Sequence, residues 1–189
     1  MWALVKSGSV DTIIGGPVAL TLNDIQYPKS IFNVWSDSEL LAIGIYKIVD
    51  KDRPDHNFYD VGPSSYSYNS GTDKVNEDFT VTEKNVDKLK SDLTESTQHQ
   101  GMDKLMLYDW LTSRYIFDNT KAIPSAVTTY AAAVRSHCAT ICTAIDDCSD
   151  LDAIKVVHAK IYAADGEYNT GWPDDKDVNK YKRNVLMGH

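Results

Sequence analysis

The first 82 residues alternate between short apolar runs and turn residues, a pattern typical of β-strands joined by tight connections. Ser7-Gly8-Ser9 separates the first two runs, and Gly15-Gly16-Pro17 separates the second from the third. Further along, apolar and polar residues alternate with the period of two expected for half-buried strands. We therefore predict strands at residues 1–6, 10–14, 18–22, 45–49, 58–61, 64–68, 74–75 and 79–81.

One short helix interrupts this β-rich region. Ser36 precedes Glu39 by three residues, the spacing of a capping box, in which each side chain bonds the other residue's backbone N–H. Trp35 before the cap and Leu40 after it supply the apolar pair that commonly accompanies this motif. Gly44 is expected to end the helix, because glycine adopts a left-handed conformation at little cost.

From Thr82 onward the apolar spacing changes to three and four residues, which indicates helices. Two groups of apolar residues have this spacing, one before residue 94 and one after residue 101. The polar interval 94–101 between them is expected to be a helix break or a mobile link. A helix is then expected to begin at Pro124, with Val127, Tyr130, Val134, Cys138, Ile141 and Ile145 on one apolar stripe. Ser149-Asp150 is expected to cap the next helix, which a linker of about four residues should place antiparallel to its predecessor.

These patterns predict an α+β fold. The expected divisions are a β-rich N-terminal unit with one short capped helix at 1–82, a helical region at 83–165 and an irregular tail at 166–189. A last helical turn is expected in the tail around Lys180–Leu186.

Composition and charge narrow the classes of function. The 189 residues include 19 Lys+Arg and 27 Asp+Glu, a net charge of −8, whereas nucleic-acid binding needs a concentrated basic surface. No apolar run approaches the roughly 20 residues of a membrane helix. The start of the chain turns polar too soon for a secretory signal, so we expect synthesis and folding in a cytoplasm. We therefore expect neither nucleic acid nor membrane as a partner.

Common catalytic and cofactor signatures are absent from the sequence, including the P-loop, the dinucleotide-binding glycine motif and the zinc-protease motif. Cys138 and Cys142 are four residues apart on a predicted helix, which favours buried free thiols over a zinc knuckle. Asp175-x-Asp177-x-Asn179 begins like a calcium loop but lacks its glycine and glutamate, which favours a solvated acidic turn. We expect no cofactor, no metal and no enzymatic activity.

The segment Ser64–Gly71 is rich in Tyr, Ser, Asn and Gly, the residue types of binding loops. The alternative is an exposed hairpin whose tyrosines pack on one face of a sheet, and the sequence leaves both open. Core or subunit-interface residues, rather than a ligand cage, are the interpretation for Trp35, Trp110 and the aromatic cluster Tyr108, Tyr115 and Phe117. The candidate partner-binding residues, chosen by side-chain type and polar flanks, are Trp35, Tyr66, Tyr68, Trp110 and Trp172.

Three stretches resemble tail-associated and tail-fibre-module proteins of tailed marine bacteriophages. The first, Ile25–Tyr46, has a Tyr-Pro pair followed by a Ser-x-x-Glu-Leu helix that ends in Ile-Gly-Ile. The opening Met1–Lys6 is similar to the start of proteins in this group, and Ile123–Arg135 resembles a helical segment that often follows. The resemblance carries over no catalytic residue.

This resemblance implies a structural protein of the virion tail, an adaptor or tail-fibre-associated subunit that is synthesised in the host cytoplasm. Its partners would be other tail subunits, with copies of the chain forming a symmetric homo-oligomer. Two alternatives remain open at this point: a tail-fibre assembly chaperone that is not retained in the virion, and a small glycan-acting hydrolase with two carboxylates across a cleft.

Overall fold

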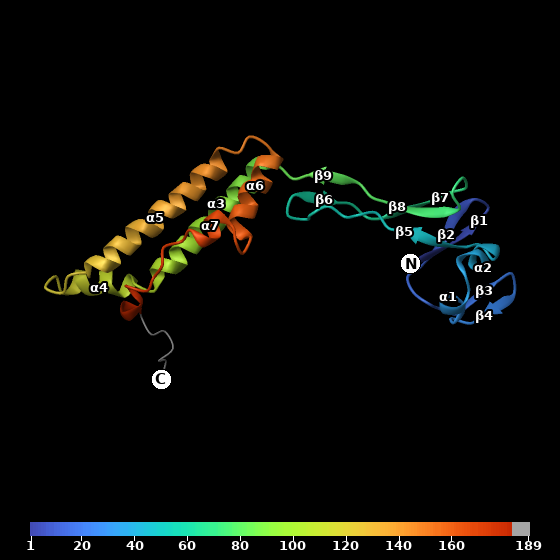
Figure 1. Cartoon of the computed structure of the whole chain (residues 1–189), viewed down its shortest axis with the longest axis horizontal. Coiled ribbons are helices and arrows are strands. Elements are labelled where there is room, and N and C mark those ends of the chain that lie inside the picture. Colours follow the sequence, from blue (N-terminus) through green and yellow to red (C-terminus); the bar gives the residue numbers. More distant parts are fainter. Residues whose placement is uncertain (183–189) are drawn as a thin grey trace. The chain divides into compact units, whose positions relative to one another are not determined.

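The computed structural model describes residues 1–182 and confirms the predicted α+β class. The chain forms two compact units, Met1–Thr82 and Glu83–His189. The first is built mainly from strands and the second from helices (Figure 1).

The first unit contains nine strands and two short helices. They are β1 (Trp2–Lys6), β2 (Ser9–Ile14), β3 (Leu20–Leu22), β4 (Ile25–Tyr27), α1 (Ile31–Val34), α2 (Asp37–Ala42), β5 (Ile45–Val49), β6 (Tyr59–Val61), β7 (Ser65–Asn69), β8 (Lys74–Asp78) and β9 (Val81–Glu83). Five of the strands form one sheet in the order β2-β1-β5-β8-β7, in which β5 and β8 are parallel and the other neighbours antiparallel. The edge strands β2 and β7 approach each other, so the sheet is curled. Two small pairs, β3–β4 and β6–β9, accompany it.

Two hairpins of this unit have two-residue turns with positive φ at both positions. Ser7 and Gly8 join β1 to β2 with φ of 52° and 80°, and Asn23 and Asp24 join β3 to β4 with φ of 50° and 65°. This geometry matches the right-handed twist of paired strands. The sequence analysis missed β4, because Asn-Asp is a weaker signal for this turn than Asn-Gly.

The predicted capping box of α2 is confirmed. The backbone N–H of Ser36 donates to a carboxylate oxygen of Glu39 at 2.7 Å, and the N–H of Glu39 donates to Oγ of Ser36 at 3.4 Å. Gly44 follows the helix with φ of +80°, as expected. A Cβ at that position would lie 3.1 Å from the carbonyl oxygen of Val5, so the close approach of β1 is a second reason for glycine.

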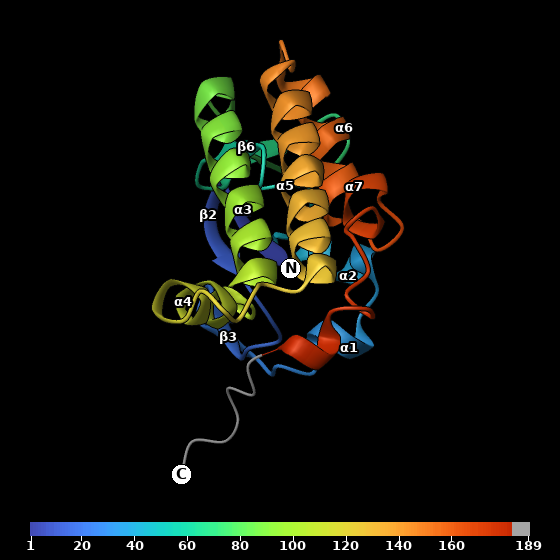
Figure 2. The same ribbon diagram turned by 90° about the vertical axis from the view of Figure 1, so that its left-hand side faces the viewer.

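The second unit contains α3 (Val86–Met106), α4 (Asp109–Phe117), α5 (Ser125–Asp146), α6 (Leu151–Tyr162), α7 (Glu167–Thr170) and the 3₁₀ turn η1 (Asn179–Tyr181). The long helices α3 and α5 lie side by side, and α6 packs against both (Figure 2). Lys90 Nζ near the start of α3 donates to the carbonyl of Asp146 at the end of α5, at 2.6 Å, which shows that the two helices are antiparallel. Asp150 caps α6 as expected, by accepting a hydrogen bond from the N–H of Ala153.

The expected break at 94–101 is wrong, because α3 runs through it without interruption. Thr97 is 1% exposed and Gly101 is buried where α3 contacts Cys138 of α5. Packing against α5 therefore outweighs the polar composition and the glycine of this interval. Pro124 is the N-cap residue of α5, so the helix begins at Ser125, one residue later than predicted.

The tail after α7 folds back on the helices. Val178 is buried with Tyr108, Leu111, Val127 and other residues of α4 and α5 in one apolar cluster. The predicted turn at Lys180–Leu186 extends beyond the described residues, and the structure has η1 at its start. Within residues 1–182, no helix is both long and apolar enough to cross a bilayer.

Candidate functional site

Tyr66 and Tyr68 lie on the same face of β7, half-buried. They pack against a small core of Ala3, Ile48 and Val75. The ring centroid of Tyr68 lies 4.8 Å from that of Tyr46, and its hydroxyl donates to Asp73 at 2.8 Å. The packing is that of tyrosines on one face of a sheet, which leaves only part of each ring for a partner.

Trp35 is also half-buried in the first unit, at the end of α1. It packs against the core cluster that contains Leu40 and Ile45. Its ring meets that of Tyr27 edge-on at a centroid distance of 5.8 Å. Trp35 therefore helps to hold the β3–β4 hairpin against this core.

The other two candidates, Trp110 and Trp172, border one apolar cluster of the second unit. Trp110 Nε1 donates to the carbonyl of Tyr181 at 3.0 Å, which attaches the tail to α4. Trp172 contacts the ring of His137 at 4.8 Å, and the ammonium group of Lys104 lies 5.1 Å from its ring centroid. The structure thus places Trp110 and Trp172 at one cluster of the second unit and Tyr66 and Tyr68 at one cluster of the first. Trp35 packs against another cluster of the first unit.

Of the aromatic residues interpreted from the sequence as core or interface, Tyr108 is buried, whereas Tyr115 and Phe117 are exposed and belong to a series of exposed apolar side chains between residues 102 and 117. Met102 and Met106 share one face of α3, and both are exposed. At the end of α4, Ile116 is 73% and Phe117 90% exposed, and Tyr115 beside them is also exposed. The run Tyr115-Ile116-Phe117 was an available signal, since a helix that buries one face cannot bury three consecutive residues. We use the name α3–α4 apolar surface for these five exposed side chains, two on α3 and three consecutive ones at the end of α4.

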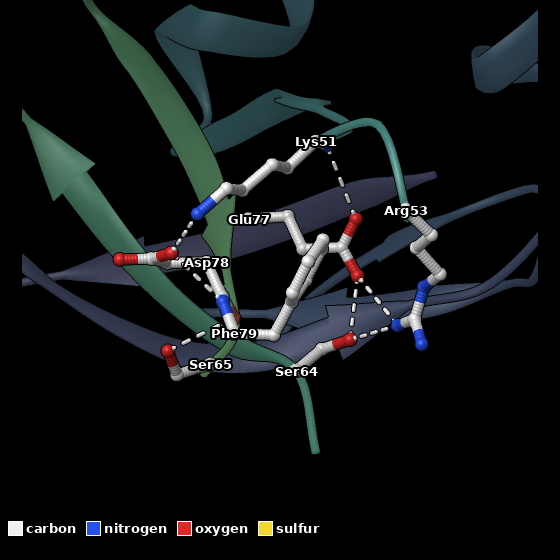
Figure 3. A network of polar contacts seen from close by, with 7 residues as sticks. All are labelled: Lys51, Arg53, Ser64, Ser65, Glu77, Asp78 and Phe79. Atoms are coloured by element: carbon white, nitrogen blue, oxygen red, sulfur yellow. Dashed lines mark hydrogen bonds and ion pairs between the residues drawn. The ribbon is translucent and has the colours of Figure 1, made fainter. Parts of the chain in front are cut away.

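A network of polar contacts surrounds Glu77 of β8 in the first unit (Figure 3). One of its carboxylate oxygens accepts from Ser64 Oγ at 2.5 Å and from Arg53 at 3.2 Å. The other accepts from the backbone N–H of Lys51 at 3.3 Å. The ammonium of Lys51 and the guanidinium of Arg53 both lie about 5 Å from the ring centroid of Phe79.

This network binds the segment 51–64 to β8. The Glu77 side chain is only 7% exposed, yet the hydrogen bond from Ser64, with those from Lys51 and Arg53, lowers its pKa. Both carboxylate oxygens are engaged by groups of the protein itself. We therefore interpret Glu77 as a structural residue.

The cysteines carry no metal-binding geometry. All three are free thiols, and within residues 1–182 no group of three or more His, Cys, Asp or Glu side chains could hold a metal ion. Burial, with the neighbouring Cys138, raises the pKa of Cys142 to about 11, and burial also raises that of Cys148. Such thiols are poor nucleophiles and poor metal ligands at neutral pH.

The acidic turn of the tail carries its own lysine partners. Asp174 pairs with Lys176 at 2.6 Å, and Asp175 pairs with Lys182. The acidic turn at this position is therefore a salt-bridged surface.

No protein-family description, curated protein or solved structure matches this chain.

Proposed function

We propose that this chain is a structural subunit of a bacteriophage tail, an adaptor or tail-fibre-associated protein that binds other tail subunits and catalyses no reaction. Two features support the proposal. One is the resemblance of the segments 1–6, 25–46 and 123–135 to tail-associated proteins, and the other is the α3–α4 apolar surface.

The α3–α4 apolar surface carries the proposal. Burying a side chain as large as Ile116 or Phe117 contributes roughly 1.5–3 kcal/mol relative to leaving it in water. Exposed apolar side chains that follow one another in the chain, as Tyr115, Ile116 and Phe117 do at the end of α4, are typical of sites that bind another protein when polar residues surround them. Asp118 follows Phe117 directly and Asp109 begins α4, so a carboxylate stands at each end of this helix. We assign this surface to contact with a neighbouring protein chain of the tail.

The decisive experiment places a photo-crosslinking amino acid at position 117 and uses phage particles that incorporate the variant. The expected result is that purified virions contain the chain and that irradiation joins it to a tail protein, identified by mass spectrometry. The control carries the same amino acid at Val34, which is 77% exposed in α1 of the first unit. It should give no comparable product.

The outcomes separate the possible roles. A cross-link to a second copy of the chain would assign the surface to the expected homo-oligomer. Cross-linking in infected cells, with no peptide of the chain in finished virions, would replace the proposal by an assembly chaperone. Absence from both would refute a role in the tail.

A further inference from the structure

A groove runs between α3 and α5, the two long helices that lie side by side (Figure 2). Its middle is a hollow of about 510 Å³ with mostly apolar walls, among them Met102, Cys138, Ala139 and Cys142. Gln98 lines this hollow and also a second one near the start of α3, so the two hollows adjoin. Met102 is 65% exposed, which leaves apolar surface of the groove in water. We call the two hollows together the α3–α5 groove.

The α5 side of this groove has one charge at each end. Arg135 lines the apolar hollow, and Asp146 lines the second hollow. Apart from His137, they are the only acidic or basic residues of α5. Both are exposed, and within residues 1–182 neither makes an ion pair. Asp146 follows Arg135 by about three helical turns, so both lie on one side of α5, about 16 Å apart.

The residues between these charges complete a face that suits another helix. Arg135, Ala139, Cys142 and Asp146 follow each other at intervals of four, three and four residues. This is the spacing of a helix face that packs against a second helix. The middle of the face is small and apolar, and its ends carry opposite charges. Such a face is complementary to a copy of itself that lies antiparallel, because each charge then meets its opposite.

The acidic end of the groove holds more than one carboxylate. Asp87 and Glu95 of α3 line the same hollow as Asp146. Lys90 also lines it, but its ammonium group donates to the backbone carbonyl oxygens of Asp146 at 2.6 Å and of Cys148 at 3.1 Å. A guanidinium group from a partner would therefore meet three carboxylates at this end.

We propose that the α3–α5 groove is the contact between two copies of this chain. A two-fold axis crosses α5 between Ala139 and Cys142, and the two α5 helices lie antiparallel across it. Arg135 of each copy then faces Asp146 of the other. The apolar walls of both grooves are buried between these two pairs of charges.

A second copy fits this groove better than an unrelated helix does. An unrelated helix would need the same two charges in the reverse order at the same separation, whereas a second copy carries them already. The inference goes beyond the proposed function, since the pairing needs no tail protein. The groove also lies apart from Ile116 and Phe117, which do not line it.

The first test is sedimentation equilibrium of the full chain from about 1 µM to about 200 µM, where we expect a reversible change from monomer to dimer. Arg135→Asp brings carboxylates together across the axis and should raise the Kd of the dimer about tenfold or more. Asp146→Arg should also weaken the dimer. The double variant restores opposite charges and should pair more tightly than either single variant. Lys121→Asp, at an exposed lysine outside the groove, makes the same change in net charge as Arg135→Asp and should dimerise as the parent does.

A second pair of variants tests the position of the axis. Ala139→Arg places a long charged side chain next to the axis, where the two copies approach most closely, and should abolish pairing. Ala133→Arg, at an exposed alanine of the same helix that does not line the groove, should leave the dimer intact. The circular dichroism spectrum of each variant should match that of the parent, which separates loss of pairing from loss of fold.

Three results would overturn the inference. The first is a chain that stays monomeric over the whole concentration range. The second is a dimer that Arg135→Asp and Ala139→Arg leave intact, which would place the contact on another face. The third is a double variant that pairs no better than the single ones, which would exclude the antiparallel arrangement. Each of these results leaves the cross-linking at position 117 untouched, so this inference and the proposed function fail separately.

Discussion

A carboxylate withdrawn from water keeps its charge only when its surroundings replace the lost hydration. Glu77 meets this condition through Ser64, Arg53 and the backbone of Lys51, all from the segment that crosses β8. The side chain therefore attaches both ends of the segment 51–64 to β8, whereas the sheet hydrogen bonds of this segment are those of β6 with β9. Its role can be tested through the pH dependence of stability.

We expect Glu77→Gln to destabilise the protein at neutral pH and to do so less as the solution is acidified. The pKa of Glu77 in the folded chain lies below the ordinary value of 4.5, chiefly because of the bond from Ser64. The ionised form thus stabilises the fold above that value, and the contribution disappears as the pH falls through the lowered pKa. Urea unfolding of parent and variant from about pH 7 to about pH 3 should give curves that converge. Asp60→Asn, at an exposed carboxylate of β6, is the control, and a constant difference for Glu77→Gln would contradict the assignment.

The thiols allow a second test at the level of single residues. Because the pKa of Cys142 is about 11, only about one in a thousand of its side chains is a thiolate at pH 8. We expect its alkylation by iodoacetamide, followed by peptide mass spectrometry, to be at least about 100-fold slower in the folded chain than in denaturant. Rapid labelling of the folded chain would show that Cys142 is reactive and reopen a chemical role for this helix.

Among the elements, α3 shows how packing decides a helix that its own sequence leaves open. Its residues 94–101 are polar and end in a glycine, and isolated helices gain little from such a sequence. The contact of Thr97 and Gly101 with α5 supplies the missing stability. Gly101 has the lowest helix propensity of these residues, so a substitution there can stabilise α3.

We expect Gly101→Ala to raise the free energy of unfolding by about 0.5–1 kcal/mol, because alanine restricts the unfolded chain and favours the helix. The added Cβ would lie 3.6 Å from Cβ and Sγ of Cys138 and 3.8 Å from the Trp172 ring, which are ordinary contact distances. Gly44→Ala is the opposite case and should cost about 1–2 kcal/mol, since its φ is +80°. Thermal and urea unfolding measure both variants. A destabilised Gly101→Ala would mean that α3 and α5 lie closer than the structure shows.

The elements that the sequence predicted well are those specified by neighbouring residues. The capping box at Ser36, the glycine stop at 44 and the apolar stripe of α5 each depend on side chains within one or two turns. The continuity of α3, the strand β4 and the parallel pairing of β5 with β8 depend on partners distant in the sequence. A single sequence does not reveal such partners.

The candidate sites of the whole molecule show the same difference between features specified by neighbouring residues and features that depend on distant ones. Residue type selected Trp172, but its contacts with His137 and Lys104 could be recognised only once α3, α5 and the tail were in place. Trp35, Tyr66 and Tyr68 were selected by the same rule and pack against apolar clusters of the first unit. Aromatic type with polar flanks therefore does not separate surface anchors from half-buried core residues.

Each of the two compact units has buried clusters drawn from its own residues. The stability of each unit should therefore be changed by substitutions in that unit alone. Ile45 belongs to a cluster of the first unit and Leu111 to one of the second, and each is 1% exposed. Either residue changed to Ala should cost its own unit about 2–5 kcal/mol, the usual range for removing a large buried aliphatic side chain. Hydrogen exchange read by mass spectrometry resolves the two units, and Ile45→Ala should reduce protection in residues 1–82 while α5 and α6 keep theirs. Leu111→Ala should do the reverse, and a loss of protection throughout the chain in either variant would show that the units unfold as one.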